Sequence, residues 1–171
     1  MVEKYGTVKK LIVIRHGKST WDNLQLRDFD RPLNERGRQD APKIGQRLAS
    51  LSLMPDKFIS SPAKRAISTA FAIGEEIGFH KDEIHQDINL YGATASDLLK
   101  VLANLDDTEK LVFLVGHNPG LTDFINSYMG YPLQILPTCG ICCADFKINS
   151  WSEIFQNNGT LIFFDSPRSQ K

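Results

Sequence analysis

The chain has 171 residues, of which 42% are hydrophobic and 23% are charged. These values are typical of a globular protein, and the length favours one domain over residues 1–171. Lys plus Arg and Asp plus Glu each total 20. No excess of positive charge therefore argues for binding to nucleic acid.

The first ten residues, MVEKYGTVKK, lack the apolar run of a secretion signal. No stretch has the roughly 20 apolar residues that cross a membrane. We therefore expect a cytoplasmic protein with no membrane or nucleic-acid partner.

A first strand is predicted at residues 11–15, where four apolar residues precede Arg15. A helix is predicted to follow, with Asn34 as its N-cap and Glu35 in its first turn. Pro42 would kink this helix or delay its start. The apolar residues at helical spacing are Ala41, Ile44, Leu48 and Leu51.

Residues 56–60 predict a second strand, followed by a helix with Ser61 as N-cap and Pro62 as its first residue. Gly78 is a typical stop signal for that helix. Its apolar stripe consists of Ala66, Ile67, Ala70, Ile73 and Ile77.

In the second half of the chain, Thr94 and Asp97 have the spacing of a capping box at the start of a helix. Residues 111–115 form a continuous apolar run, which is typical of a strand that is covered on both faces. Another helix is predicted in LTDFINSYMG, and residues 142–148 and 160–166 predict a hairpin. The alternation of strands and helices indicates an α/β sandwich with a mainly parallel sheet and an antiparallel edge.

The three cysteines, Cys139, Cys142 and Cys143, lie together in TCGICCADF. The C-x-x-C spacing of the first two allows redox or zinc chemistry, but no second Cys/His pair accompanies them at zinc-ribbon distance. We therefore expect small side chains of a buried strand and no metal site.

A polar cluster follows each of three predicted strands: Arg15-His16-Gly17, residues 60–65 and residues 116–120. The carboxyl ends of parallel strands share one edge of a sheet, where ligands of α/β proteins gather. We therefore expect Arg15, His16, Arg65 and His117 to converge. Guanidinium groups match phosphate oxygens, and a neutral imidazole can attack phosphorus near pH 7. Each residue alone could be structural, but three coincident clusters favour a phosphate site.

The first cluster could instead belong to a nucleotide-binding P-loop, because Gly17-Lys18-Ser19 matches the end of that motif. The motif requires glycine five residues before Gly17. Ile12 stands there, inside the predicted strand. The P-loop is therefore excluded.

The segments IRHGKSTW, SSPAKRAISTA and VGHNPGL resemble the histidine phosphatase superfamily, whose fold is phosphoglycerate-mutase-like. Within it, the chain is most similar to the short SixA-type phosphohistidine phosphatases. The resemblance implies that His16 is the nucleophile and that Arg15, Arg65 and His117, the last as a cation, stabilise the phosphoryl group. It also implies substrate contacts from Ser19, Asp22 and Arg31, and it implies no cofactor.

The larger members of this superfamily carry a glutamate that protonates the leaving alkoxide, and we align it with Asn89, which cannot act as an acid. The resemblance then favours phosphohistidine on a protein as the substrate. A phosphatase of small phosphomonoesters and a phosphate-binding domain without turnover are the alternatives.

Overall fold

The structure is a computed structural model, and it describes residues 7–156 and 158–169. One mixed sheet forms the middle layer, with its six strands in the order β3-β2-β4-β1-β5-β6. Strands β1, β2, β3 and β4 are parallel, whereas β5 pairs antiparallel with both of its neighbours, β1 and β6. The strands are β1 (Val8–Arg15), β2 (Lys57–Ser60), β3 (His85–Gln86), β4 (Leu111–Gly116), β5 (Ile141–Lys147) and β6 (Gly159–Asp165).

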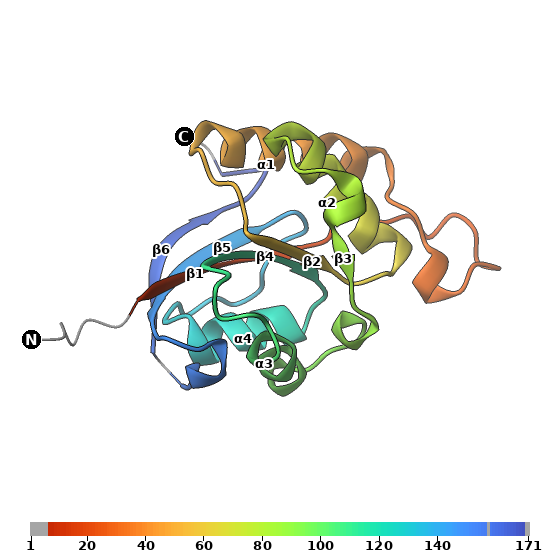
Figure 1. Ribbon diagram of the computed structural model, residues 1–171. Coiled ribbons are helices and arrows are strands. Elements are labelled where there is room, and N and C mark those ends of the chain that lie inside the picture. The colour runs from red at the N-terminus through yellow and green to blue at the C-terminus, as the bar shows by residue number, and fades with distance from the viewer. Residues whose placement is uncertain (1–6, 157, 170–171) are drawn as a thin grey trace, which may run out of the picture.

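Two helices cover each face of the sheet (Figure 1), so the described part of the chain is a three-layer α/β sandwich. Helices α1 (Glu35–Ser50) and α2 (Lys64–Ile77) lie on one face, and α3 (Ala95–Ala103) and α4 (Gly120–Tyr128) lie on the other. Short 3-10 helices are η1 (Asp28–Asp30), η2 (Lys81–Glu83), η3 (Ile88–Leu90) and η4 (Trp151–Glu153). The predicted architecture is therefore confirmed.

The side chains of strand β1 contribute to two hydrophobic cores, one on each face of the sheet. Its side chains alternate between the two faces, as in any strand. Leu11 and Val13 join the cluster that contains α3 and α4, whereas Ile12 and Ile14 join the cluster that contains α1 and α2. All four are at most 1% exposed. An apolar run without alternation in polarity is therefore what this central strand requires.

The predicted caps at Asn34 and Thr94 are confirmed. Asn34 Oδ1 accepts a hydrogen bond from the backbone N–H of Gly37 at 2.9 Å. Thr94 and Asp97 form the reciprocal capping box. Pro42 lies inside α1 and does not delay its start. Leu51, which we expected on the apolar stripe, is the C-cap residue and is 54% exposed.

The predicted start of the second helix at Ser61 and Pro62 is wrong. Helix α2 begins at Lys64, after Ala63. The Ser61 N–H donates to the backbone oxygen of Val115 at 3.0 Å, so Ser61 still pairs with β4. The polar residues after β2 therefore make a turn of their own before the helix starts.

The C-terminal hairpin is confirmed, because β5 and β6 pair in antiparallel register. Cys142 points into the cluster with α3 and α4, and Cys139 and Cys143 lie in the opposite cluster. All three thiols are buried and free, and burial raises the pKa of each to about 12. They are core side chains, as the sequence indicated. Within the described ranges no helix is long and apolar enough to span a membrane.

Candidate active site

The three polar clusters meet where β1, β2 and β4 end side by side. Arg15 pairs with Gly116 in the sheet register, and the His16 N–H donates to the Gly116 oxygen at 3.2 Å. Ser60 pairs with Val115 on the other side of β4. Parallel pairing of these strands thus brings residues about 50 and 100 positions apart to one edge.

His16 is 8% exposed, and its ring has one defined orientation. Nδ1 lies 2.7 Å from the backbone oxygen of Gly17. Because a carbonyl oxygen only accepts, Nδ1 carries the proton and Nε2 carries the lone pair. Arg65 Nε donates to that Nε2 at 3.3 Å. The nitrogen that could attack phosphorus is therefore unprotonated and faces the cationic side chain of α2.

Burial and the neighbouring groups keep His16 neutral. Desolvation is the largest cause that lowers its pKa, to about 3, and the charges of His117, Arg65 and Arg15 act in the same direction. The hydrogen bond to Gly17 opposes them. A neutral imidazole at pH 7 is the form that a nucleophile needs.

His117 lies against the same space, with its ring centroid 5.1 Å from that of His16. Nε2 is 2.7 Å from Ser61 Oγ, and Nδ1 is 3.5 Å from Arg65 Nη2. Since a guanidinium only donates, Nδ1 carries the lone pair and Nε2 carries the proton. Desolvation, followed by the charge of Arg65, lowers the pKa of His117 to about 4.

This pKa revises one expectation for the site. We expected His117 to act as a cation, but at pH 7 the ring is neutral in the site as described. A dianion placed between the two imidazoles would favour the protonated ring. A bound phosphate group would therefore raise the pKa of His117.

Arg15 projects from the end of β1, and its Nη1 donates to the backbone oxygen of Leu136 at 2.9 Å. Its Nε is buried and has no partner in the described residues. Desolvation and the charge of Arg65 lower the pKa of Arg15 from its ordinary value. An anion placed beside Arg15 would oppose both effects.

These side chains line a cavity of about 240 Å³. It is lined by Arg15, His16, Lys18, Ser19, Trp21, Arg31, Arg65, His117, Asn118 and Thr138. Ligand pockets for drug-sized molecules are roughly 300–1,000 Å³. The cavity therefore fits a phosphoryl group and leaves the rest of a substrate outside.

Of the three further residues that we expected to contact substrate, two line the cavity. Ser19 is 9% exposed and pairs with Leu33 in an isolated bridge. Arg31 is 7% exposed, and its Cζ lies 3.4 Å from the ring centroid of Trp21. Its buried Nη1 has no hydrogen-bond partner among the residues that the structure describes. Asp22 is exposed, and the structure does not place it in the cavity wall.

The sequence reasoning missed Asp28, which lies on η1 and contacts two of the arginines. Asp28 Oδ2 accepts from Arg65 Nη2 at 3.0 Å, and its backbone oxygen accepts from Arg65 Nη1 at 2.6 Å. Asp28 Oδ1 accepts from Arg31 Nη2 at 3.0 Å. The hydrogen bond from Tyr91, followed by the contacts with Arg65, holds the pKa of Asp28 at about 2. The spacing of Asp28 and Arg31, three residues apart, is the one sequence signal that could have indicated this pair.

Thr69, also missed, ties the loop after β1 to helix α2. Its Oγ1 accepts from the Gly17 N–H at 2.9 Å and donates to the Arg65 oxygen at 2.7 Å. Thr69 and Gly17 are in direct contact, although they are 52 residues apart in the chain. This buried hydroxyl therefore sets the position of His16 relative to Arg65.

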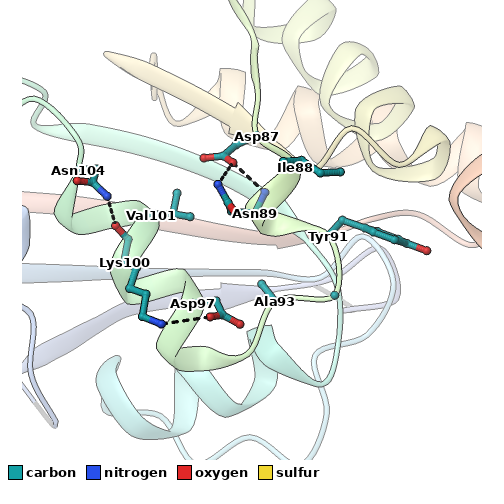
Figure 2. A pocket seen from close by; sticks show the side chains of 10 residues that line it. Asp87, Ile88, Asn89, Tyr91, Ala93, Asp97, Lys100, Val101 and Asn104 are labelled. Atoms are coloured by element: carbon teal, nitrogen blue, oxygen red, sulfur yellow. Dashed lines mark hydrogen bonds and ion pairs between the residues drawn. The ribbon is translucent and has the colours of Figure 1, made fainter.

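Asn89, which we aligned with the family glutamate, does not line the cavity that contains His16 and His117. It lines a neighbouring pocket of about 480 Å³ with Asp87, Tyr91, Asp97, Lys100 and other residues. Figure 2 shows its amide beside the Asp87 carboxylate, and Asn89 Nδ2 donates to Asp87 Oδ1 at 3.0 Å. The Tyr91 ring points away from Lys100 and Asn104 in the same view, and it packs edge-on against His117.

No group of three or more His, Cys, Asp or Glu side chains that could hold a metal ion occurs among residues 7–156 and 158–169. The basic side chains that line the cavity are Arg15, Lys18, Arg31 and Arg65. The geometry thus defines a class of protein, an α/β protein with a small cavity lined by two buried histidines and several basic side chains at the edge of its parallel strands.

Comparison with known proteins gives the family. The profile of the histidine phosphatase superfamily (branch 1) matches residues 11–93. The chain is 32% identical over 159 residues to an uncharacterised chloroplast protein of Arabidopsis thaliana, covering 88% of this chain and 72% of that protein. It is 34% identical over 111 residues to the 2,3-bisphosphoglycerate-dependent phosphoglycerate mutase of Streptomyces avermitilis, covering 61% of this chain and 44% of that enzyme. The chain belongs to the histidine phosphatase superfamily.

Solved structures agree with this placement. A protein from Agrobacterium tumefaciens assigned as phosphohistidine phosphatase SixA has a TM-score of 0.77 at 28% identity, over 93% of this chain and 98% of that one. The protein histidine phosphatase SixA in complex with tungstate has a TM-score of 0.79 at 19% identity, over 92% and 97% of the two chains. The phosphoglycerate-mutase-like fold is therefore confirmed.

Proposed function

We propose that this chain is a phosphatase that forms a phosphohistidine on His16 and removes phosphate from phosphohistidine on a protein. The observation that carries the proposal is the convergence of Arg15, His16, Arg65 and His117 on one small cavity. The His16 lone pair faces that cavity wall, and the Arg15 and Arg31 side chains each keep a buried N–H without a protein partner. Buried unpaired N–H groups are costly, and phosphate oxygens would satisfy them.

The chemistry follows from these groups. His16 Nε2 attacks phosphorus, so that an Nε2–P bond forms as the bond to the leaving group breaks. Arg15, Arg65 and protonated His117 stabilise the charge on the phosphoryl oxygens, which is the main requirement of phosphoryl transfer. Water then attacks phosphorus, the Nε2–P bond breaks, and inorganic phosphate leaves.

The choice of phosphohistidine as substrate rests on the leaving group and on the cavity. Asn89 cannot protonate an alkoxide, and its side chain is held by Asp87 in the neighbouring pocket. A phosphoimidazole that is protonated on its second ring nitrogen leaves as neutral imidazole and needs no proton from the enzyme. The small cavity leaves the remainder of the substrate outside, which suits a protein surface.

Turnover of two substrate classes tests the proposal. We expect phosphate release from a phosphohistidine protein to have a kcat/KM at least 100-fold above that for a small alkyl phosphate. His16→Ala should abolish release, whereas His85→Ala should not change it, because His85 is exposed on the edge strand β3. A preference for the alkyl phosphate would contradict the substrate class. No release from any phosphorylated compound would contradict the activity itself.

A further inference from the structure

The Asp28 carboxylate is the only acidic side chain of the described residues that contacts the arginines lining the phosphate cavity. It lies on η1, and its side chain is 49% exposed, so it faces the cavity arginines from the outside. Asp28 contacts two guanidiniums. One belongs to Arg31, three residues further along the chain, and the other to Arg65 in α2.

Each contact with Asp28 uses the outer edge of Arg65, so the inner edge faces the two histidine rings. Nη1 donates to the Asp28 backbone oxygen and Nη2 donates to Oδ2. The Nε–H and the second Nη2–H then face His16 Nε2 at 3.3 Å and His117 Nδ1 at 3.5 Å. That inner edge is a two-donor fork directed between the two imidazoles, which is the geometry that binds two phosphate oxygens.

Arg31 is held in the same way. Its Nε and Nη2 lie 3.2 and 3.0 Å from Asp28 Oδ1. Its Nη1 is the buried atom without a partner, and Arg31 lines the cavity. One carboxylate thus fixes two guanidiniums so that each retains N–H groups for a ligand.

The carboxylate is itself held by a third donor. Tyr91 OH donates to Asp28 Oδ2 at 2.7 Å, and the Tyr91 ring packs edge-on against Phe29 and His117, with ring centroids 5.1 and 5.5 Å away. Phe29 neighbours Asp28 in η1. The orientation of Asp28 is therefore fixed from two sides.

We infer that Asp28 is a positioning residue, which orients Arg65 and Arg31 for the phosphoryl group without touching it, and that Tyr91 supports Asp28 in this role. The inference rests on the proposed function for its effect on turnover. Its effect on anion binding is independent of turnover. The pairing also places one negative charge beside the guanidiniums of Arg31 and Arg65.

The test compares Asp28→Asn with Asp30→Asn. Asp30 lies on the same 3-10 helix, but it pairs with exposed Arg27 and does not line the cavity. We expect Asp28→Asn to weaken tungstate binding about 10-fold and to lower kcat/KM about 10- to 100-fold, the range for a misplaced catalytic group. Asp30→Asn should match the wild type in both. Tyr91→Phe, which leaves both arginine contacts in place, should have a smaller effect in the same direction.

A spectroscopic signature separates positioning from a general loss of structure. The Arg65 Nε–H should give a sharp NMR signal in the wild type and in Asp30→Asn, and a broadened one in Asp28→Asn, while the thermal unfolding midpoints of the variants stay within a few degrees. Tungstate affinity in Asp28→Asn equal to or tighter than in the wild type would overturn the inference. A wild type that binds tungstate but releases no phosphate would contradict the proposed function and leave this comparison valid.

Discussion

In the proposed mechanism His16 and His117 need opposite protonation states, although both line one cavity that also contains arginines. In this mechanism His16 attacks as a neutral ring, and its lone pair is placed on Nε2 by the hydrogen bond from Nδ1 to Gly17. His117 has its lone pair on Nδ1 towards the cavity, so it can donate to a phosphate oxygen there only after it gains a proton. The phosphate dianion itself supplies the charge that favours this proton.

Binding of a phosphate analogue should therefore take up a proton on His117 at pH 7. In the wild type, calorimetry of tungstate binding in buffers of different ionisation enthalpy should show close to one proton taken up. His117→Gln cannot be protonated, so it should show almost none, and it should bind tungstate more weakly. Equal proton uptake in the two proteins would contradict the assignment.

At the residue scale, the sequence predicted the residues whose position follows from the strands and missed those that act through other side chains. Arg15, His16 and His117 directly follow strands or end them, and parallel pairing then determines that they meet. Asp28 follows no strand, and the family resemblance pointed instead to Asp22, which does not line the cavity. Asp28 reaches the site only because the long segment between β1 and α1 folds back over Arg65.

Among the elements, local chemistry explains which boundaries were predicted. The caps at Asn34 and Thr94 depend on a side chain and a backbone N–H three residues apart, so the sequence contains the whole interaction. Ser61 instead pairs with β4 and contacts His117, both far away in the chain. Strand β3 has only two residues, both exposed, and leaves no hydrophobic pattern to detect.

The close approach of α1 to the loop after His16 explains Gly37. A Cβ at this position would lie 2.3 Å from the Lys18 backbone oxygen and 3.1 Å from Leu33 Cδ2. Both the loop and the helix would have to move. The first turn of α1 thus depends on glycine to pack against the segment that follows His16.

Gly37→Ala should therefore destabilise the protein by about 1–3 kcal/mol, the usual cost of overpacking, despite the better helix propensity of alanine. Urea unfolding measures this change. Gln39→Ala, an exposed position in the same helix, serves as the control and should change stability by less than about 0.5 kcal/mol. A Gly37→Ala protein as stable as the wild type would show that the loop is not held against α1.

At the scale of the whole molecule, two buried histidines make folding stability depend on pH. Two histidines are buried as neutral rings beside arginines, and desolvation is the main cause that lowers both pKa values, to about 3 and about 4. An unfolded histidine has a pKa near 6.5. Between these values, the unfolded chain binds more protons than the folded chain.

Folding stability should therefore fall as the pH decreases from about 6.5 towards 4, and should be insensitive to these histidines above pH 7. Each buried neutral histidine contributes up to about 1.4 kcal/mol per pH unit within that window. Urea unfolding at pH 7 and pH 5 measures the difference. His16→Asn and His117→Asn should each reduce the pH dependence, and their double variant should remove most of it. Unchanged pH dependence in the double variant would contradict the buried neutral state.

The central claim is that phosphate passes through His16. Intact-protein and peptide mass spectrometry, after rapid mixing with a phosphohistidine protein and quenching in alkali, where phosphohistidine survives, tests it most directly. We predict one added phosphoryl group, located on His16, which forms and decays at rates that account for turnover and which is absent in His16→Ala. Phosphate release by a wild type that carries phosphate on no residue, or on a histidine other than His16, would contradict the account.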